Sequence, residues 1–308
     1  MIYSIGGTVT ASDYNDLIAQ INAIFGVGDG DSGYGGNSVK VPSFGDLVDA
    51  SEGDDITNEM WLDLRNAFDD CALHQDTTLT DGLPSVNDIE EGDLVSFFPR
   101  LNSSQNIFDL TVNRLQVDST FVPEMEANPP NNVNSVRTTP WSSFIQHVFT
   151  ITFSDSDHAR YFFNTGGYIT IAASRTGGTG SPQEQAWDSI LSGPDFMFTG
   201  EHYFSLTGSA EELRPQISPS SGPYSGVGAY SASNIWTILG ERVDSQGPNG
   251  GNGSVIKIYS NFLDGNTNPP DTVEGTFSSL ITEFKFIDIF DQIDSPIYST
   301  ITELSGGL

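Results

Sequence analysis

Cysteines and basic residues are scarce in this chain, and their scarcity excludes several kinds of protein. Among 308 residues there is one cysteine, Cys71, so no disulfide can form within the chain. Cys71 falls in an apolar helical pattern, which indicates a buried thiol rather than a nucleophile. The 41 acidic residues outnumber the 11 basic ones and give a formal net charge of −30. Since such a surface repels nucleic acid, we expect no nucleic-acid partner.

Long hydrophobic runs are also missing. The sequence contains no run of about 18 apolar residues, the length that a membrane-spanning helix needs. Its first residues, MIYSIGGTVTASDYND, lack the basic region and the apolar core of a signal peptide. We therefore expect a soluble chain that has no membrane partner and is not exported by the usual route.

Catalytic and metal-binding motifs are equally scarce. The four histidines are scattered, and none lies at the short spacing that helps to assemble a zinc site; they are His74, His147, His158 and His202. The Gly-x-Ser-x-Gly signature of serine hydrolases is absent. We therefore expect no enzyme, no cofactor and no metal, although a triad assembled from distant residues stays open.

One glycine-rich tract, GVGDGDSGYGG at 26–36, has two partial resemblances to ligand-binding loops. Its glycines match the dinucleotide-binding spacing, but the tract follows a helix, and Asp29 and Asp31 would oppose a pyrophosphate. It also resembles the start of a calcium loop, yet Lys40 stands where the closing carboxylate is needed. A turn is the preferred interpretation, with an adventitious cation as the alternative.

Negative charge is concentrated near the N-terminus. Up to Asp93 there are 19 acidic and 2 basic residues, a net charge of −17, which leaves −13 for the rest of the chain. This third of the chain is therefore either a solvated acidic surface or a surface that meets a basic or cation-rich partner.

Two amphipathic helices are predicted in the N-terminal third, over 10–25 and 57–75. Thr10 or Ser12 can cap the first helix and Thr57 the second. Aligning Thr10 with Thr57 superposes Tyr14 on Trp61 at an offset of 47 residues, which indicates a duplicated helix-plus-loop unit. The apolar stripes of such short helices need further cover, from the chain itself or from another subunit. We expect an assembly interface formed by Tyr14, Leu17, Ile21, Trp61, Leu64 and Phe68.

After residue 76 the sequence changes to segments rich in β-branched and aromatic residues, bounded by Gly, Pro, Asn and Ser. Segments 123–140 and 264–275 are predicted loops, segment 195–208 is a predicted strand, and 242–259 is a predicted hairpin. The expected fold is α+β: a small N-terminal helical segment followed by a mainly antiparallel, β-sandwich-like body with short inserted helices. The predicted division is a helical docking segment at 1–90 and a β-rich body at 91–308.

The stretch 155–187 is predicted to be scaffolding rather than the wall of an active site. Asp155 or Asp157 should cap a short helix that ends at Gly166 and Gly167. A strand and a loop then lead to a second short helix that carries Trp187. Arg160 and Arg175 are expected to pair with local carboxylates.

Three phrases of the sequence resemble a family of structural virion proteins of tailed bacteriophages, often myoviruses of aquatic hosts. They are TASDYNDLIAQINAIFGVGDGDSGYGG at 10–36, ITNEMWLDLRNAFDDCALHQ at 56–75 and FSDSDHARYFFNTGGYITIAASRTGG at 153–178. The resemblance covers residues 5–80 and 145–195. It implies a non-enzymatic particle component, with other virion proteins as partners and a homo-oligomer such as a trimer. Such a protein is assembled in the host cytoplasm and located in the virion, and the resemblance carries over no catalytic residues.

The resemblance leaves the place of the chain in the particle open. A tail subunit, at the baseplate or where fibres attach, is the leading hypothesis. A neck, collar or capsid-exterior fibre or decoration protein fits the acidic surface equally well. A host-surface carbohydrate-binding protein or depolymerase is a third possibility, and it would need exposed aromatic platforms beside paired carboxylates.

Overall fold

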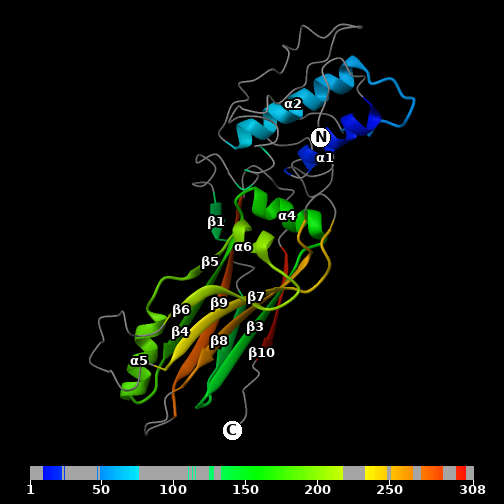
Figure 1. The fold of residues 1–308 in the computed structure, drawn as a ribbon. Helices are drawn as coiled ribbons and strands as arrows, with labels where there is room; N and C mark the ends of the chain where they lie inside the picture. Colours follow the sequence, from blue (N-terminus) through cyan, green and yellow to red (C-terminus); the bar gives the residue numbers. More distant parts are fainter. Residues whose placement is uncertain are drawn as a thin grey trace.

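The structure is a computed structural model that describes residues 10–22, 24, 47, 49–75, 110, 113, 115, 125–127, 133–217, 233–247, 251–265, 272–286 and 296–302. Two helices precede a β-rich body (Figure 1). The helices are α1 (Ala11–Asn22), α2 (Asn58–His74), α4 (Ser156–Asn164), α5 (Pro182–Leu191) and α6 (Gly200–Ser205). The strands are β1 (Met125–Ala127), β2 (Val133–Arg137), β3 (Phe144–Thr152), β4 (Tyr168–Thr176), β5 (Phe196–Phe198), β6 (Glu211–Ile217), β7 (Ile235–Arg242), β8 (Val255–Leu263), β9 (Thr276–Phe286) and β10 (Ile297–Thr302).

The strands form two five-stranded sheets, and every described pair is antiparallel. The first sheet has the order β1-β9-β4-β5, with β2 also paired to β9. The second sheet has the order β10-β3-β8-β7-β6. The α+β class with an antiparallel, sheet-rich body and short inserted helices, predicted from the sequence, is confirmed.

The two sheets pack against each other because alternate residues of their strands are apolar. In β3, for example, Ile145, Phe149 and Ile151 are fully buried, as expected for a strand with one face toward a core. Phe262 of β8 and Phe277 of β9 make an edge-to-face contact, with 5.6 Å between ring centroids. Since these residues belong to different sheets, the contact lies in the core of a β-sandwich.

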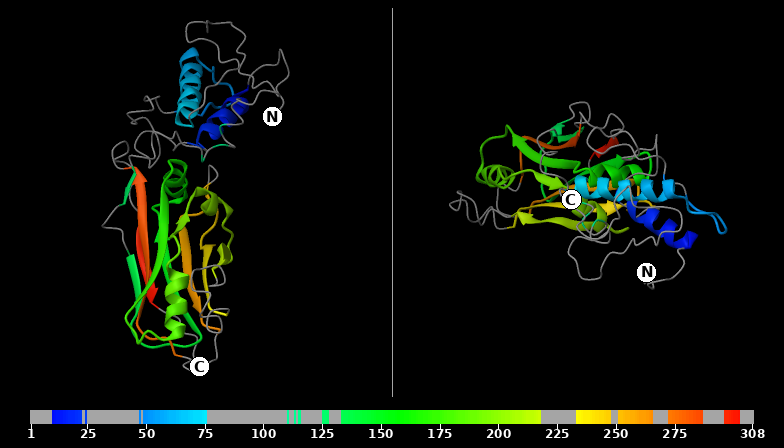
Figure 2. Two further views of the ribbon diagram at one scale, coloured as in Figure 1. Left: turned by 90° about the vertical axis from the view of Figure 1, so that its left-hand side faces the viewer. Right: turned by 90° about the horizontal axis from the view of Figure 1, so that it is seen from above.

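Helices close one long edge and one end of the sandwich (Figure 2). α5 packs on β4 of the first sheet and on β7 of the second. Its Trp187 is fully buried and contacts the rings of both Phe262 and Phe277. α4 lies at the end of the sandwich that is nearer α1 and α2 (Figure 1). The helices thus complete a core that the sheets leave open.

Two local predictions were wrong. Segment 195–208 is a strand only at β5, and the helix α6 follows it. Thr199 begins this helix, since the backbone N–H and the hydroxyl of Thr199 contact His202 Nδ1 at 3.2 and 3.1 Å. The predicted loop 123–140 contains β1 and β2, since residues there pair with β9 despite the many Asn and Pro around them. The hairpin is confirmed as the antiparallel pair β7 and β8.

The helical segment and the body share one core. Buried residues of α1 and α2 belong to the same hydrophobic cluster as those of the sandwich. At the junction, Asn164 Nδ2 of α4 donates to the carbonyl of Ile24 at 3.0 Å, and both residues are fully buried. The predicted boundary between residues 90 and 91 lies outside the described residues. None of the described helices is long and apolar enough to cross a membrane.

Candidate assembly interface

Helices α1 and α2, predicted to be a duplicated unit, begin in the same way. Thr10 Oγ1 accepts from the backbone N–H of Asp13 at 3.2 Å, and Thr57 Oγ1 accepts from that of Met60 at 3.2 Å. Both are the threonine caps that the sequence predicts. Asp13 Oδ2 also accepts from the backbone N–H of Thr10 at 2.9 Å, so the first cap is reciprocal. The Thr10 hydroxyl also donates to Asp13 Oδ2 at 2.6 Å, and this bond, followed by the one from the Thr10 backbone N–H, lowers the pKa of the Asp13 carboxyl.

Equivalent positions of the two units contact each other. The rings of Tyr14 and Trp61, which the 47-residue offset superposes, pack edge to face with 5.5 Å between centroids. The Tyr14 hydroxyl donates to the carbonyl of Met60 at 3.3 Å. Asn15 adds a clamp, since its side chain bonds both the N–H and the C=O of Ala50, at 2.8 and 2.9 Å. The apolar stripes of the two helices therefore cover one another.

The six residues expected at an assembly interface lie inside the chain. Their exposed fractions are between 0 and 6%, and all belong to the shared core: Tyr14, Leu17, Ile21, Trp61, Leu64 and Phe68. The cover that these stripes need comes from the chain itself, so another subunit is not required for it. A partner that approaches this end of the molecule meets other side chains of α1 and α2.

The charged side chains at this end are almost all acidic. The described parts of 10–75 contain ten acidic residues and one basic residue, Arg65, whose Nη2 lies 3.4 Å from Asp69 Oδ2. Burial, followed by the charge of Glu59, raises the pKa of Asp63. Burial and the carboxylates of Asp63 and Asp49 raise the pKa of Tyr14 to about 12. The helical end thus combines a closed apolar interior with a negatively charged surface, which suits a basic partner.

α4 joins this helical end to the sandwich, and its caps are those predicted. Asp155 Oδ1 accepts from the backbone N–H of His158 at 2.7 Å. The N–H groups of Gly166 and Gly167 bond the carbonyls of Phe163 and Phe162, which ends the helix. Arg160 is fully buried, and its Nε lies 3.3 Å from Asp157 Oδ1. The stretch therefore serves as scaffolding.

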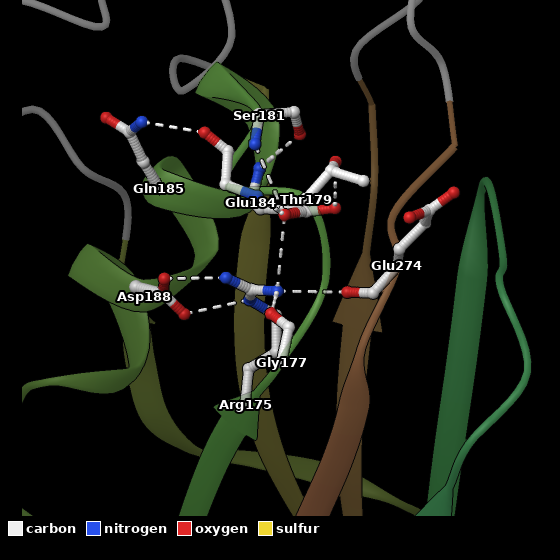
Figure 3. A network of polar contacts seen from close by, with 9 residues as sticks. Arg175, Gly177, Thr179, Ser181, Glu184, Gln185, Asp188 and Glu274 are labelled. Atoms are coloured by element: carbon white, nitrogen blue, oxygen red, sulfur yellow. Dashed lines mark hydrogen bonds and ion pairs between the residues drawn. The ribbon is translucent and has the colours of Figure 1, made fainter.

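Arg175 organises the loop between β4 and α5 (Figure 3). Its guanidinium bonds both carboxylate oxygens of Asp188, at 2.8 and 2.6 Å, and donates to the carbonyls of Gly177 and Glu274. Its Nη1 also lies 3.6 Å from Glu184 Oε2. The predicted pairing of Arg160 and Arg175 with local carboxylates is thus confirmed.

Glu184 is the second centre of this network, and the sequence analysis missed it. Its Oε2 accepts from the backbone N–H groups of Gly180 and Ser181, at 2.6 and 3.2 Å, while Ser181 caps α5. Burial raises the pKa of Glu184, but these hydrogen bonds, one from Thr179 and the charge of Arg175 together hold it below its usual value. The Ser-x-x-Glu spacing of Ser181 and Glu184 is a capping-box signal that could have identified it.

Among the histidines whose side chains the structure describes, His147 takes part in a buried chain of hydrogen bonds. His147 is fully buried between the sheets, and its Nδ1 lies 2.8 Å from Ser279 Oγ. Ser279 Oγ donates to Ser260 Oγ at 3.0 Å, and Ser260 Oγ also accepts from Trp236 Nε1. Within the part of the chain that the structure describes, no group of three or more His, Cys, Asp or Glu is arranged to hold a metal ion. The side chain of His74 and the glycine-rich tract 26–36 lie outside the described residues.

No protein-family model, no curated protein and no solved structure matches this chain.

Proposed function

We propose that the chain is a non-enzymatic structural subunit of a tailed-phage particle, placed in the tail at the baseplate or where fibres attach. The observation that carries the proposal is the resemblance of 10–36, 56–75 and 153–178, in this order, to structural virion proteins. The described parts of the first two phrases include α1 and α2, and the third phrase contains α4 and β4. α4 meets the helical end, since Asn164 Nδ2 donates to the carbonyl of Ile24.

The helical end is the proposed attachment site, and its acidic side chains make the contact. The six stripe residues are interior, so they support the surface without touching the partner. Glu52, Asp55 and Glu59 are exposed there. A basic surface on a neighbouring virion protein, other than a copy of this chain, is the complementary partner.

Mass spectrometry of density-gradient-purified particles tests membership of the virion. The expected result is recovery of peptides from this chain at a constant ratio to the major tail proteins. Absence of the chain from every particle fraction would overturn the proposal. Gold-labelled antibody against the chain then locates it, and label at the neck or on the capsid would replace the tail location by the collar or decoration role.

A matched pair of variants tests the attachment site. Replacing Glu52→Gln, Asp55→Asn and Glu59→Gln together removes three charges from the helical end without touching the core. The control removes three exposed charges from the body, through Asp195→Asn, Glu201→Gln and Glu211→Gln. We expect the first variant to be depleted from particles by about tenfold or more and the control to be incorporated normally. Equal incorporation of both variants would show that the helical end does not attach the chain.

A carbohydrate-binding role finds no support in the described surface. None of the large hydrophobic side chains that are well exposed on the described residues is aromatic. Sugar-binding surfaces use aromatic platforms, and the surface rings of the described body, such as Tyr168 and Tyr259, are half-buried. Binding of host polysaccharide by the purified chain would nevertheless establish this role.

A further inference from the structure

The outer face of the second sheet is unusually poor in charge for a chain of net charge −30. Residues on this face alternate with buried ones along β3, β7 and β8. Half-buried residues of this face include Phe144, Gln146, Thr237, Leu239, Tyr259 and Asn261, whereas Val148, which shares the face, is only 5% exposed. On these three central strands the described face thus has one acidic and one basic residue, Glu241 and Lys257, and the edge strand β6 adds Glu212, which pairs with Leu239.

Exposed apolar side chains are found on this face. The exposed large hydrophobic residues of the described chain are Val136, Met197, Val243, Leu263 and Ile297. Leu263, 43% exposed, ends β8 beside Phe144, and Ile297, 73% exposed, pairs with Thr152 on the edge strand β10. Val243 follows β7 and bonds Val255. These side chains lie at the two ends of the sheet, Leu263 at the Phe144 end and Ile297 and Val243 at the end where Thr152 pairs with Val255.

The face is large enough for a stable contact. Five strands spaced by about 4.8 Å give a width of about 24 Å, and strands of six to nine residues at about 3.3 Å per residue give a mean length of about 26 Å. The product, about 600 Å² for each copy, is at the lower end of the roughly 600–1,000 Å² that each partner buries in a standard interface. None of the described helices covers this face, because α5 packs along an edge of the sandwich and α4 at its end (Figures 1 and 2).

We propose that this face binds the same face of a second copy of the chain, related by a two-fold axis. Two copies of net charge −30 repel each other, and the repulsion is least where the contacting surfaces carry almost no net charge. The central strands also carry both members of a complementary pair, since Glu241 lies opposite Lys257 in the β7–β8 register. A two-fold contact brings each member near its complement on the other copy.

This inference does not depend on the virion role and can be tested on the purified chain. The test variant carries Leu263→Glu and Ile297→Glu, and the matched control carries Val136→Glu and Met197→Glu on the first sheet. All four positions are exposed, so each pair adds two charges without entering the core. Sedimentation velocity and native mass spectrometry measure the oligomeric state, and circular dichroism confirms folding.

We expect dimers of the wild-type chain and of the control, and a dissociation constant raised at least about tenfold in the test variant. A monomeric wild-type chain at high micromolar concentration would overturn the proposal. So would a control that dissociates while the test variant remains associated. If the test variant does not fold, Ile297→Glu alone at the most exposed position replaces it, with the same expectation.

A charge exchange tests the two-fold relation itself. Lys257→Glu should weaken the dimer, as should Glu241→Lys, because each places like charges at the contact. Mixing the two variants should restore association through the complementary pair. Failure of the mixture to associate, or association of either variant alone as tightly as the wild type, would refute a face-to-face two-fold contact.

Discussion

Individual buried polar residues in this protein keep the charge state that their surroundings favour, and two of them give the stability a defined pH dependence. Glu184 has a pKa below its usual value, as the hydrogen bonds around it outweigh its burial. A lowered carboxyl pKa contributes stability above the pKa of the unfolded chain, and that contribution is lost as the pH falls through the folded value.

The variant Glu184→Gln tests this contribution. At neutral pH we expect the free energy of unfolding of this variant to be about 1–3 kcal/mol lower than that of the wild type, because the buried backbone donors lose a charged acceptor. The difference between the two melting temperatures should shrink as the pH falls below about 4.3, the pKa of glutamate in an unfolded chain, and on through the lower pKa of the folded state. A difference that stays constant from neutral pH to pH 3 would show that Glu184 is not ionised in the folded state.

His147 makes the stability depend on pH in a higher range than Glu184 does. Burial, followed by the charge of Arg137, lowers its pKa to about 4. The unfolded chain then takes up a proton at a pH where the folded chain does not, so stability falls as the pH drops from about 6.5 to about 4. We expect a loss of about 3 kcal/mol over this range in the wild type and little in His147→Gln. Parallel thermal melts of the two proteins measure it, and identical pH profiles would contradict a neutral buried imidazole.

At the scale of elements, the helical segment is joined to the sandwich through a shared core. A substitution in the apolar stripe can therefore show whether the six stripe residues stabilise the fold of the single chain or form a contact with another subunit. Trp61→Ala should destabilise the isolated chain by about 3–5 kcal/mol, since a large buried side chain is lost. Chemical denaturation of the purified chain measures the change. Leu62→Ala, at a half-buried neighbouring position, is the control and should cost much less. If Trp61→Ala is as stable as the wild type, the stripe does not stabilise the single chain, and an interface with another subunit becomes the better interpretation.

The elements that the sequence predicts best are those with a strong period and clear caps. Thr10, Thr57 and Asp155 begin the helices that they were expected to begin, and β3, β4, β7 and β8 follow from alternating apolar residues. β2 was missed because its pairing with β9 is a long-range contact that local composition does not show. α6 was missed because its aromatic residues also fit a strand, and only the cap at Thr199 separates the two.

The candidate site was less predictable than the fold. An amphipathic stripe has the same pattern whether it meets the chain or another subunit, so the sequence could not show that Tyr14 and Trp61 face each other. The sequence also could not show the low-charge outer face of the second sheet. It becomes visible only when the register places residues of β7 and β8 side by side.

For the whole molecule, the net charge of −30 sets the response to salt. Like charges at the helical end repel one another in the folded state, and added salt screens that repulsion. We expect the melting temperature to rise by several degrees between about 0.02 and 0.5 M sodium chloride. Potassium chloride should act equally, which separates screening from binding of a particular cation. A melting temperature that falls with salt would indicate that attractive ion pairs dominate the surface.

The central claim is that this chain is a particle subunit attached by its acidic helical end. A cryo-electron-microscopy map of the assembled particle tests this most directly, because it gives location, orientation and copy number together. The account predicts density for the two-sheet body in the tail, with α1 and α2 against a basic surface of a neighbouring protein. A map in which no density fits the sandwich, or in which the helical end points into solvent while the body makes every contact, would contradict it.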